Sequence, residues 1–134
     1  MINKLFTLSV FVVGTLLLSP SSYAQKTLEK CEKVEQKIDA LSYCLDGVKD
    51  VIDRELQTWV NNHTFNLEEK ALITGRYSPL KMFKRSQSNF ITFRENDCRW
   101  QYLIVSPKKG AANAYKKCYI LLSQSRITEL SKIQ

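Results

Sequence analysis

The chain has 134 residues, among them 20 lysines and arginines, 13 aspartates and glutamates, one histidine and four cysteines, and its formal net charge is +7. This length suits one domain, since single domains commonly run to about 100–200 residues. An apolar content of 44% excludes a disordered acidic chain or a low-complexity chain. The single histidine disfavours most histidine-based metal sites and catalytic triads.

The first 24 residues have the pattern of a secretory signal peptide. The short segment Met1–Lys4 precedes a mostly apolar run of 14 residues, Leu5–Leu18. The small residues Ser22 and Ala24 occupy the two positions that signal peptidase recognises before its cleavage site. A membrane anchor is the alternative, but this run is shorter than the ~20 residues that span a bilayer. We expect cleavage after Ala24, which leaves a single periplasmic or secreted domain at residues 25–134 with no membrane span.

Four cysteines, Cys31, Cys44, Cys98 and Cys118, lie in the predicted mature chain. An even number of cysteines in an exported protein indicates disulfide bonds, here two. A zinc site is the alternative, but the gaps of 12, 53 and 19 residues contain no close C-x-x-C pair. We therefore expect two disulfides and neither a metal nor another cofactor.

Apolar residues in the first half of the mature chain recur at helical spacing. Residues 28–45 and 48–60 both have this pattern, with polar residues between the apolar ones. The polar run Asn61–Thr64 is expected to end the helix. A short helix with a capping-box-like start is then expected from Asn66 to Gly75.

The second half predicts a helical hairpin. Ser78 followed by Pro79 places an N-cap residue before a proline at the first helical position, which predicts a long helix. The segment Ser106–Gly110 interrupts the helical pattern, and a last helix follows it. Glycine is rare, and no repeat or long linker occurs. The sequence therefore predicts an all-α fold, a small antiparallel helical bundle.

The positions of Cys98 and Cys118 agree with this hairpin. Their midpoint is residue 108, in the middle of the break between the two helices. Residues equally far from the turn of a helical hairpin lie opposite each other, so a Cys98–Cys118 disulfide is expected.

The other two cysteines pose a geometric problem. One continuous helix would hold Cys31 and Cys44 about 20 Å apart, whereas the Cα atoms of a disulfide lie within about 7 Å. A Cys31–Cys44 disulfide therefore requires the chain to fold back near Cys31, with a helix beginning near Gln36. We favour this pairing, and cross-pairing between the two halves is the alternative.

Two segments carry a family resemblance. Gln87-x-x-Phe90-x-x-Phe93-Arg94-x-x-x-Cys98, followed by Cys118-x7-Arg126-x-x-Glu129-Leu130, resembles the signature of the LprI-like lysozyme-inhibitor domain. The resemblance implies an exported, disulfide-bonded helical protein that protects peptidoglycan by occluding the cleft of a lysozyme. Such an inhibitor needs a rigid surface and complementary charge, and no catalytic residues. The motif residues would either lock the bundle together or bind the target: Gln87, Phe90, Arg94, Arg126, Glu129 and Leu130.

Charge is distributed unevenly along the mature chain. Residues 25–69 have six basic and ten acidic side chains, a net charge of −4, whereas residues 70–134 have thirteen basic and three acidic ones, a net charge of +10. The two halves either neutralise each other or present two charged faces to partners. The candidate face for a cationic lysozyme comprises Asp46, Asp50, Asp53, Glu55, Glu68 and Glu69. The candidate face for anionic envelope polymers comprises Lys81, Lys84, Arg85, Lys108, Lys109, Lys116 and Lys117.

The sequence disfavours an enzyme. His63 is expected in an exposed loop, and disulfides would occupy the thiols that a catalytic pair needs. Glu68 and Glu69 are adjacent, so on a helix they point in different directions and suit a glycosidase pair poorly. The chain has no glycine-rich phosphate loop and no nucleic-acid-binding motif. A binding protein is therefore expected, and the alternative to a lysozyme inhibitor is an envelope structural or stress protein that binds anionic polymers through the basic half.

Overall fold

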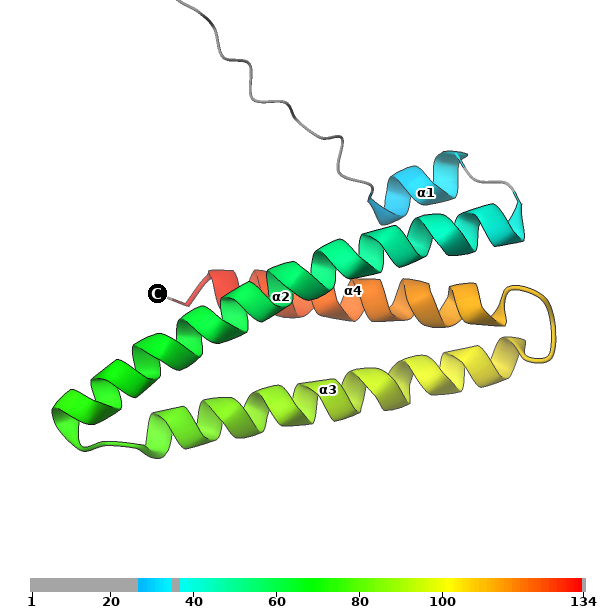
Figure 1. Cartoon of the computed structure of the whole chain (residues 1–134). Coiled ribbons are helices and arrows are strands. Elements are labelled where there is room, and N and C mark those ends of the chain that lie inside the picture. Colours follow the sequence, from blue (N-terminus) through cyan, green and yellow to red (C-terminus); the bar gives the residue numbers. More distant parts are fainter. Residues whose placement is uncertain (1–26, 35–36, 134) are drawn as a thin grey trace, which may run out of the picture.

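The protein is a bundle of helices (Figure 1). The computed structural model describes residues 27–34 and 37–133, and within these ranges the chain forms four helices and no strand. The helices are α1 (Leu28–Val34), α2 (Ile38–Thr74), α3 (Ser78–Val105) and α4 (Ala111–Ser131). The predicted all-α fold is confirmed. The predicted signal peptide lies outside the described residues, and none of the helices within them is long and apolar enough to cross a membrane.

Helix α4 lies between the two long helices α2 and α3, and α1 folds back onto the start of α2 (Figure 1). At one end of α4, Asn113 Nδ2 donates a hydrogen bond of 3.1 Å to the Ile38 carbonyl. At its other end, the Leu130 carbonyl lies 2.9 Å from His63 Nε2. Helix α4 therefore accompanies α2 only as far as His63, and the remaining turns of α2 continue past the end of α4.

The apolar core lies where α2 faces α4. The side chains of α2 that enter it recur every three or four residues, which places them on one face of the helix. Fully burying one Leu or Ile side chain stabilises a fold by roughly 1.5–3 kcal/mol, so this stripe holds α2 against α4. The buried core residues of these two helices are Cys44, Leu45, Val48, Ile52, Leu56, Ile120, Ile127 and Leu130.

The expected helix break at Asn61–Thr64 is wrong, because α2 continues without interruption through it. The segment contains no glycine or proline, and its asparagines support the helix with side-chain hydrogen bonds one turn apart, from Gln57 to Asn61 and from Asn66 to Asn62. His63 is consequently not in a loop. It is partly buried on α2, and its Nε2–H donates to the carbonyl of Leu130 near the end of α4.

The turn between α2 and α3 forms where the sequence predicts it. Gly75 adopts the left-handed conformation, with φ 70°, and its N–H donates a hydrogen bond of 2.8 Å to the Ala71 carbonyl. Glycine takes this conformation without the steric cost of a Cβ atom. Helix α3 then begins at Ser78 with Pro79 in its first turn, so the N-cap residue is Tyr77 and not the predicted Ser78.

Both expected disulfides are present. The Cα atoms are 5.7 Å apart in Cys31–Cys44 and 5.4 Å apart in Cys98–Cys118. The first pairing is possible because α1 ends at Val34 and α2 begins at Ile38, close to the expected start near Gln36, so the two cysteines lie on different helices. The second disulfide joins α3 to α4 across the turn of their hairpin.

Removing the disulfides should have separable effects. Replacing Cys98 and Cys118 with alanine should lower the free energy of unfolding by about 3 kcal/mol, because the 20-residue loop is no longer closed in the unfolded chain. Replacing Cys31 and Cys44 should mainly release α1, whose amides should then exchange rapidly with solvent while those of α3 and α4 stay protected. Denaturant unfolding and hydrogen exchange measure these effects. Equal stability of the first variant and the parent would contradict the prediction.

Candidate functional site

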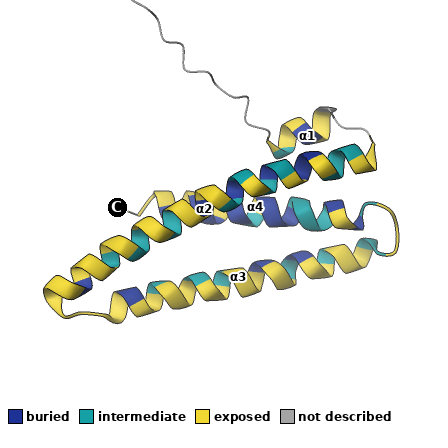
Figure 2. Cartoon of the chain, in the orientation of Figure 1, coloured by how far each residue is buried: buried dark blue, intermediate teal, exposed yellow. Residues whose placement is uncertain are grey.

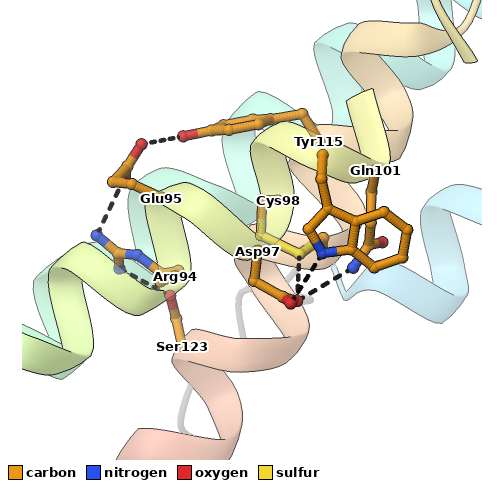
Figure 3. The surroundings of a disulfide bond; sticks show 9 residues. Arg94, Glu95, Asp97, Cys98, Gln101, Tyr115 and Ser123 are labelled. Carbon is orange, nitrogen blue, oxygen red and sulfur yellow. Dashed lines mark hydrogen bonds and ion pairs between the residues drawn. A yellow bond between two sulfur atoms is a disulfide. The ribbon is translucent and has the colours of Figure 1, made fainter. Parts of the chain in front are cut away.

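One motif residue, Arg94, is a buried arginine that reaches from α3 to α4 (Figure 3). Arg94 on α3 is only 6% exposed, and its Nη1 donates a hydrogen bond of 2.9 Å to Ser123 Oγ on α4. Its guanidinium carbon lies 3.7 Å from the centroid of the Tyr119 ring and 5.5 Å from that of Phe90. The cation is therefore held between two aromatic side chains, an arrangement that stabilises it in a desolvated place.

A carboxylate of α2 connects this helix to the contacts between α3 and α4. Asp53 on α2 accepts a hydrogen bond of 2.8 Å from the Tyr119 hydroxyl, and its other oxygen lies 2.9 Å from Lys49 Nζ. The Arg94 guanidinium lies 4.0 Å from the same carboxylate. These contacts connect α2, α3 and α4 through one polar network.

A second arginine extends the network along α4. Arg126 is 8% exposed, and it donates hydrogen bonds of 3.2 Å to both Gln87 Oε1 and Ser86 Oγ on α3. It also forms an ion pair of 2.7 Å with Glu129, and its guanidinium carbon lies 5.6 Å from the Phe90 ring. Phe90 is therefore in contact range of both arginines. The contacts of the two arginines favour the interpretation that these residues stabilise the packing of α3 against α4. The sixth motif residue, Leu130, is buried in the apolar core.

Polar contacts also surround the Cys98–Cys118 disulfide (Figure 3). Asp97 accepts hydrogen bonds from Trp100 Nε1 at 3.0 Å and from Gln101 Nε2 at 3.2 Å. Glu95 accepts a hydrogen bond from the Tyr115 hydroxyl of α4. The Asp97 contacts lie within α3, whereas the Glu95–Tyr115 hydrogen bond joins α3 to α4 beside the disulfide.

Two tyrosines of this region titrate abnormally. Burial, together with the hydrogen bond to Glu95, raises the pKa of Tyr115 to about 12. Burial and the hydrogen bond to Asp53 raise the pKa of Tyr119 well above its usual range. In both cases ionisation would leave a phenolate beside a carboxylate, so the neutral form is favoured.

The acidic residues predicted as a partner face are divided between internal contacts and solvent. Asp46 pairs with Lys116 at 2.7 Å, and Asp53 belongs to the network around Arg94. Glu68 forms an exposed pair of 2.8 Å with Lys84. Among the acidic residues predicted for this face, those that are exposed and form no ion pair within the described part of the chain are Asp50, Glu55 and Glu69.

The basic residues predicted as a polymer-binding face lie in three places. Lys81, Lys84 and Arg85 are near the start of α3, whereas Lys108 and Lys109 follow its end. A helix of 28 residues is about 42 Å long, so these two groups lie at opposite ends of the molecule. The remaining two form ion pairs on α4, Lys116 with Asp46 and Lys117 with Glu32.

The surface also carries features that sequence periodicity did not identify. Leu72, Ile73 and Met82, which flank the α2–α3 turn, are more than half exposed. At the other end of α3, an open hollow of about 550 Å³ between α3 and α4 is lined by residues that include Arg99 and Leu103. Helical periodicity alone would assign Leu72, Ile73 and Met82 to a core. The structure shows that they have no partner helix, because α4 ends before it reaches them.

Removing either buried arginine should destabilise the bundle. Arg94→Ala and Arg126→Ala should each lower the free energy of unfolding by about 2–4 kcal/mol, because partly buried carboxylates and aromatic faces lose their cation. Arg85→Ala, at an exposed position on the same helix, should change it by no more than about 0.5 kcal/mol. Denaturant unfolding measures all three. Equal stability of the Arg94 and Arg85 variants would contradict the structural role.

The tyrosine pKa values predict a loss of stability at high pH. The unfolded chain releases the tyrosine protons near pH 10, whereas the folded chain holds those of Tyr115 and Tyr119 to higher pH. Stability should therefore be unaffected below pH 10 and fall as the pH rises from 10 to about 12. Absorbance titration should show a late-ionising fraction that the Tyr115→Phe and Tyr119→Phe substitutions remove. A single normal transition in the parent protein would contradict this.

Comparison with known proteins adds one finding to this geometry. The family model described as Lysozyme inhibitor LprI matches residues 31–130, from the first cysteine to the last motif residue. No curated protein and no solved structure matches the chain. The match covers well over half of the chain and includes both disulfides and the arginine network. The chain therefore belongs to the LprI lysozyme inhibitor family.

Proposed function

We propose that this protein is an exported inhibitor that binds a lysozyme, blocks its cleft and so protects peptidoglycan. The match to the lysozyme-inhibitor family over residues 31–130 is the observation that carries this proposal. The two disulfides support it as well, because they are typical of proteins outside the reducing cytoplasm.

The rigidity of the bundle suits an inhibitor. A surface that is already ordered loses little conformational entropy when it binds, so more of its contact energy contributes to affinity. Here contacts between residues far apart in sequence hold the helices together. The Cys98–Cys118 disulfide joins α3 to α4, and Asp53 joins α2 to both of these helices. The protein would present a fixed surface without any catalytic group of its own.

The burial of the motif residues limits which residues of this protein can contact the enzyme. Arg94, Arg126 and Leu130 are each less than a tenth exposed, so they cannot contribute much area to an interface. The contacts must come from exposed residues, and a cationic lysozyme would be attracted by carboxylates that no internal cation neutralises. Among the predicted acidic residues, Asp50, Glu55 and Glu69 meet both conditions.

A second function rests on the exposed cations. Lys81, Arg85, Lys108 and Lys109 form no ion pair within the described residues, so they remain available to an anionic partner. An envelope protein that binds anionic polymers through these cations would show salt-sensitive polymer binding without protecting cells from lysozyme.

Charge reversal on α2 tests the inhibitor. The exported chain should slow lysis of peptidoglycan by a lysozyme, and Asp50→Lys/Glu55→Lys and Glu68→Lys/Glu69→Lys should each raise the inhibition constant about tenfold or more. Asp39→Lys makes the same charge change per site at an exposed position in the first turn of α2, outside the proposed face, and should have a small effect. Turbidity assays with C-type, G-type and I-type lysozymes measure the constants.

Two results would contradict the proposal. If the parent protein slowed none of the three enzymes, the inhibitor function would be rejected in favour of the polymer-binding one. If it inhibited but both double reversals inhibited equally well, the acidic face would be the wrong contact surface. Far-ultraviolet circular dichroism of each variant shows that the fold is retained.

A further inference from the structure

The end of the α2–α3 hairpin projects beyond the rest of the bundle (Figure 1). We call residues 70–85 the hairpin tip. Helix α4 ends near His63 and Ser86, since Leu130 contacts the first and Arg126 the second, so the tip has no helix packed over it. Most of its surface is exposed (Figure 2).

Large apolar side chains occupy this exposed surface. Leu72 is 76% exposed, Ile73 78% and Met82 61%, and Tyr77 in the turn is 46% exposed. Single exposed apolar residues are common on proteins, but a group of four at a projecting end indicates a contact with an apolar partner.

The charges of the tip all have one sign. It contains five cations, Lys70, Arg76, Lys81, Lys84 and Arg85, and no aspartate or glutamate occurs from residue 70 to residue 94. Only Lys84 forms an ion pair within the described residues, with Glu68. The remaining four cations are free to meet an anionic partner.

The tip is nevertheless rigid. Ala71 is 1% exposed and Leu80 8%, so the two helix ends are packed below the turn at these positions. The left-handed Gly75 and the proline in the first turn of α3 fix the turn itself. The apolar and cationic side chains are therefore presented on an ordered support, which lowers the entropic cost of binding.

We propose that the hairpin tip docks on an anionic lipid bilayer. In this contact Leu72, Ile73 and Met82 enter the boundary between headgroups and acyl chains, the Tyr77 ring lies at headgroup level, and the surrounding cations bind lipid phosphates. A bilayer is the partner that matches both properties, because it offers an apolar interior directly beneath a layer of negative charge.

Other anionic or apolar partners match the tip less well. A soluble acidic polymer would use the cations but leave the apolar side chains in water. A cationic lysozyme would be repelled by a surface that carries five cations and no acid. The opposite end of the bundle is less cationic, since Lys108, Lys109 and Arg99 there lie on a segment that also contains Glu95 and Asp97.

Vesicle flotation with the exported, disulfide-bonded chain tests the proposal. Mass spectrometry must first show that the apolar segment Leu5–Leu18 is absent, because it would bind vesicles by itself. The chain should bind phosphatidylcholine–phosphatidylglycerol vesicles and not vesicles of phosphatidylcholine alone, and binding should weaken as salt is added. Little binding to the anionic vesicles, or equal binding to both kinds, would overturn the proposal.

Variants separate the two parts of the contact. Lys81→Glu/Arg85→Glu should lower the partition coefficient about 25-fold or more, since each cation near an anionic surface contributes about fivefold. Leu72→Ser/Ile73→Ser should lower it about tenfold or more without changing binding to a soluble polyanion such as polyglutamate. Leu103→Ser/Ile104→Ser, an apolar pair at the opposite end of α3 that is also more than half exposed, is the control and should bind vesicles like the parent.

The remaining outcomes are also decisive. If Leu72→Ser/Ile73→Ser bound vesicles like the parent, the contact would be electrostatic only and insertion would be excluded. If the tip variants kept vesicle binding but lost lysozyme inhibition measured without lipid, the tip would be an enzyme contact and the proposal would be overturned. Because lysozyme inhibition is measured in the absence of vesicles, failure of the inhibitor function leaves the vesicle result interpretable. Thermal unfolding of each exposed-site variant establishes that the fold is retained.

Discussion

The buried guanidinium of Arg94 is the contact on which the arrangement of the three long helices depends. It reaches Ser123 on α4 and lies between the Phe90 and Tyr119 rings, and Tyr119 in turn donates to Asp53 on α2. The domain is small, so its apolar core alone supplies limited stability. A buried polar network adds a geometric requirement, since the contacts of Arg94 with Ser123 and of Tyr119 with Asp53 form in one register of the helices, and Arg94 Nε is left without a hydrogen-bond partner among the described residues. We interpret the network as the device that fixes how α3 lies against α4.

Local signals account for the parts of the fold that the sequence predicts correctly. Gly75 and Pro79 mark the α2–α3 turn because each has a backbone property that other residues lack. The Cys98–Cys118 pairing follows from symmetry about the second turn. The prediction of a helix break at Asn61–Thr64 is wrong because polar residues alone do not end a helix. Here His63 contacts the carbonyl of Leu130 on α4, and this contact supports the continuous helix. That tertiary contact has no signature in the local sequence.

The uneven charge of the chain has a structural consequence that composition does not reveal. Asp46 on α2 pairs with Lys116, and Glu32 on α1 pairs with Lys117, so the acidic first half and the basic second half neutralise each other where α4 lies against them. Past the end of α4, the described residues form one further ion pair between the two halves, Glu68 with Lys84. The hairpin tip therefore retains nearly all of its positive charge, whereas the exposed acids Asp50 and Glu55 lie on α2 beside the bundle.

Because Arg94, Arg126 and Leu130 are buried, the motif can identify the family without identifying the target that the protein binds. We interpret Arg94, Arg126 and Phe90 as residues that maintain the bundle, so a chain that keeps them keeps the fold whatever partner it binds. Partner choice must depend on exposed side chains, which the packing leaves free to vary. The contact residues that we propose are the unpaired carboxylates of α2 and the apolar, cationic hairpin tip. The carboxylates suit a cationic enzyme and the tip suits an anionic layer with an apolar interior, so the two proposed contacts depend on different exposed side chains of one helical bundle.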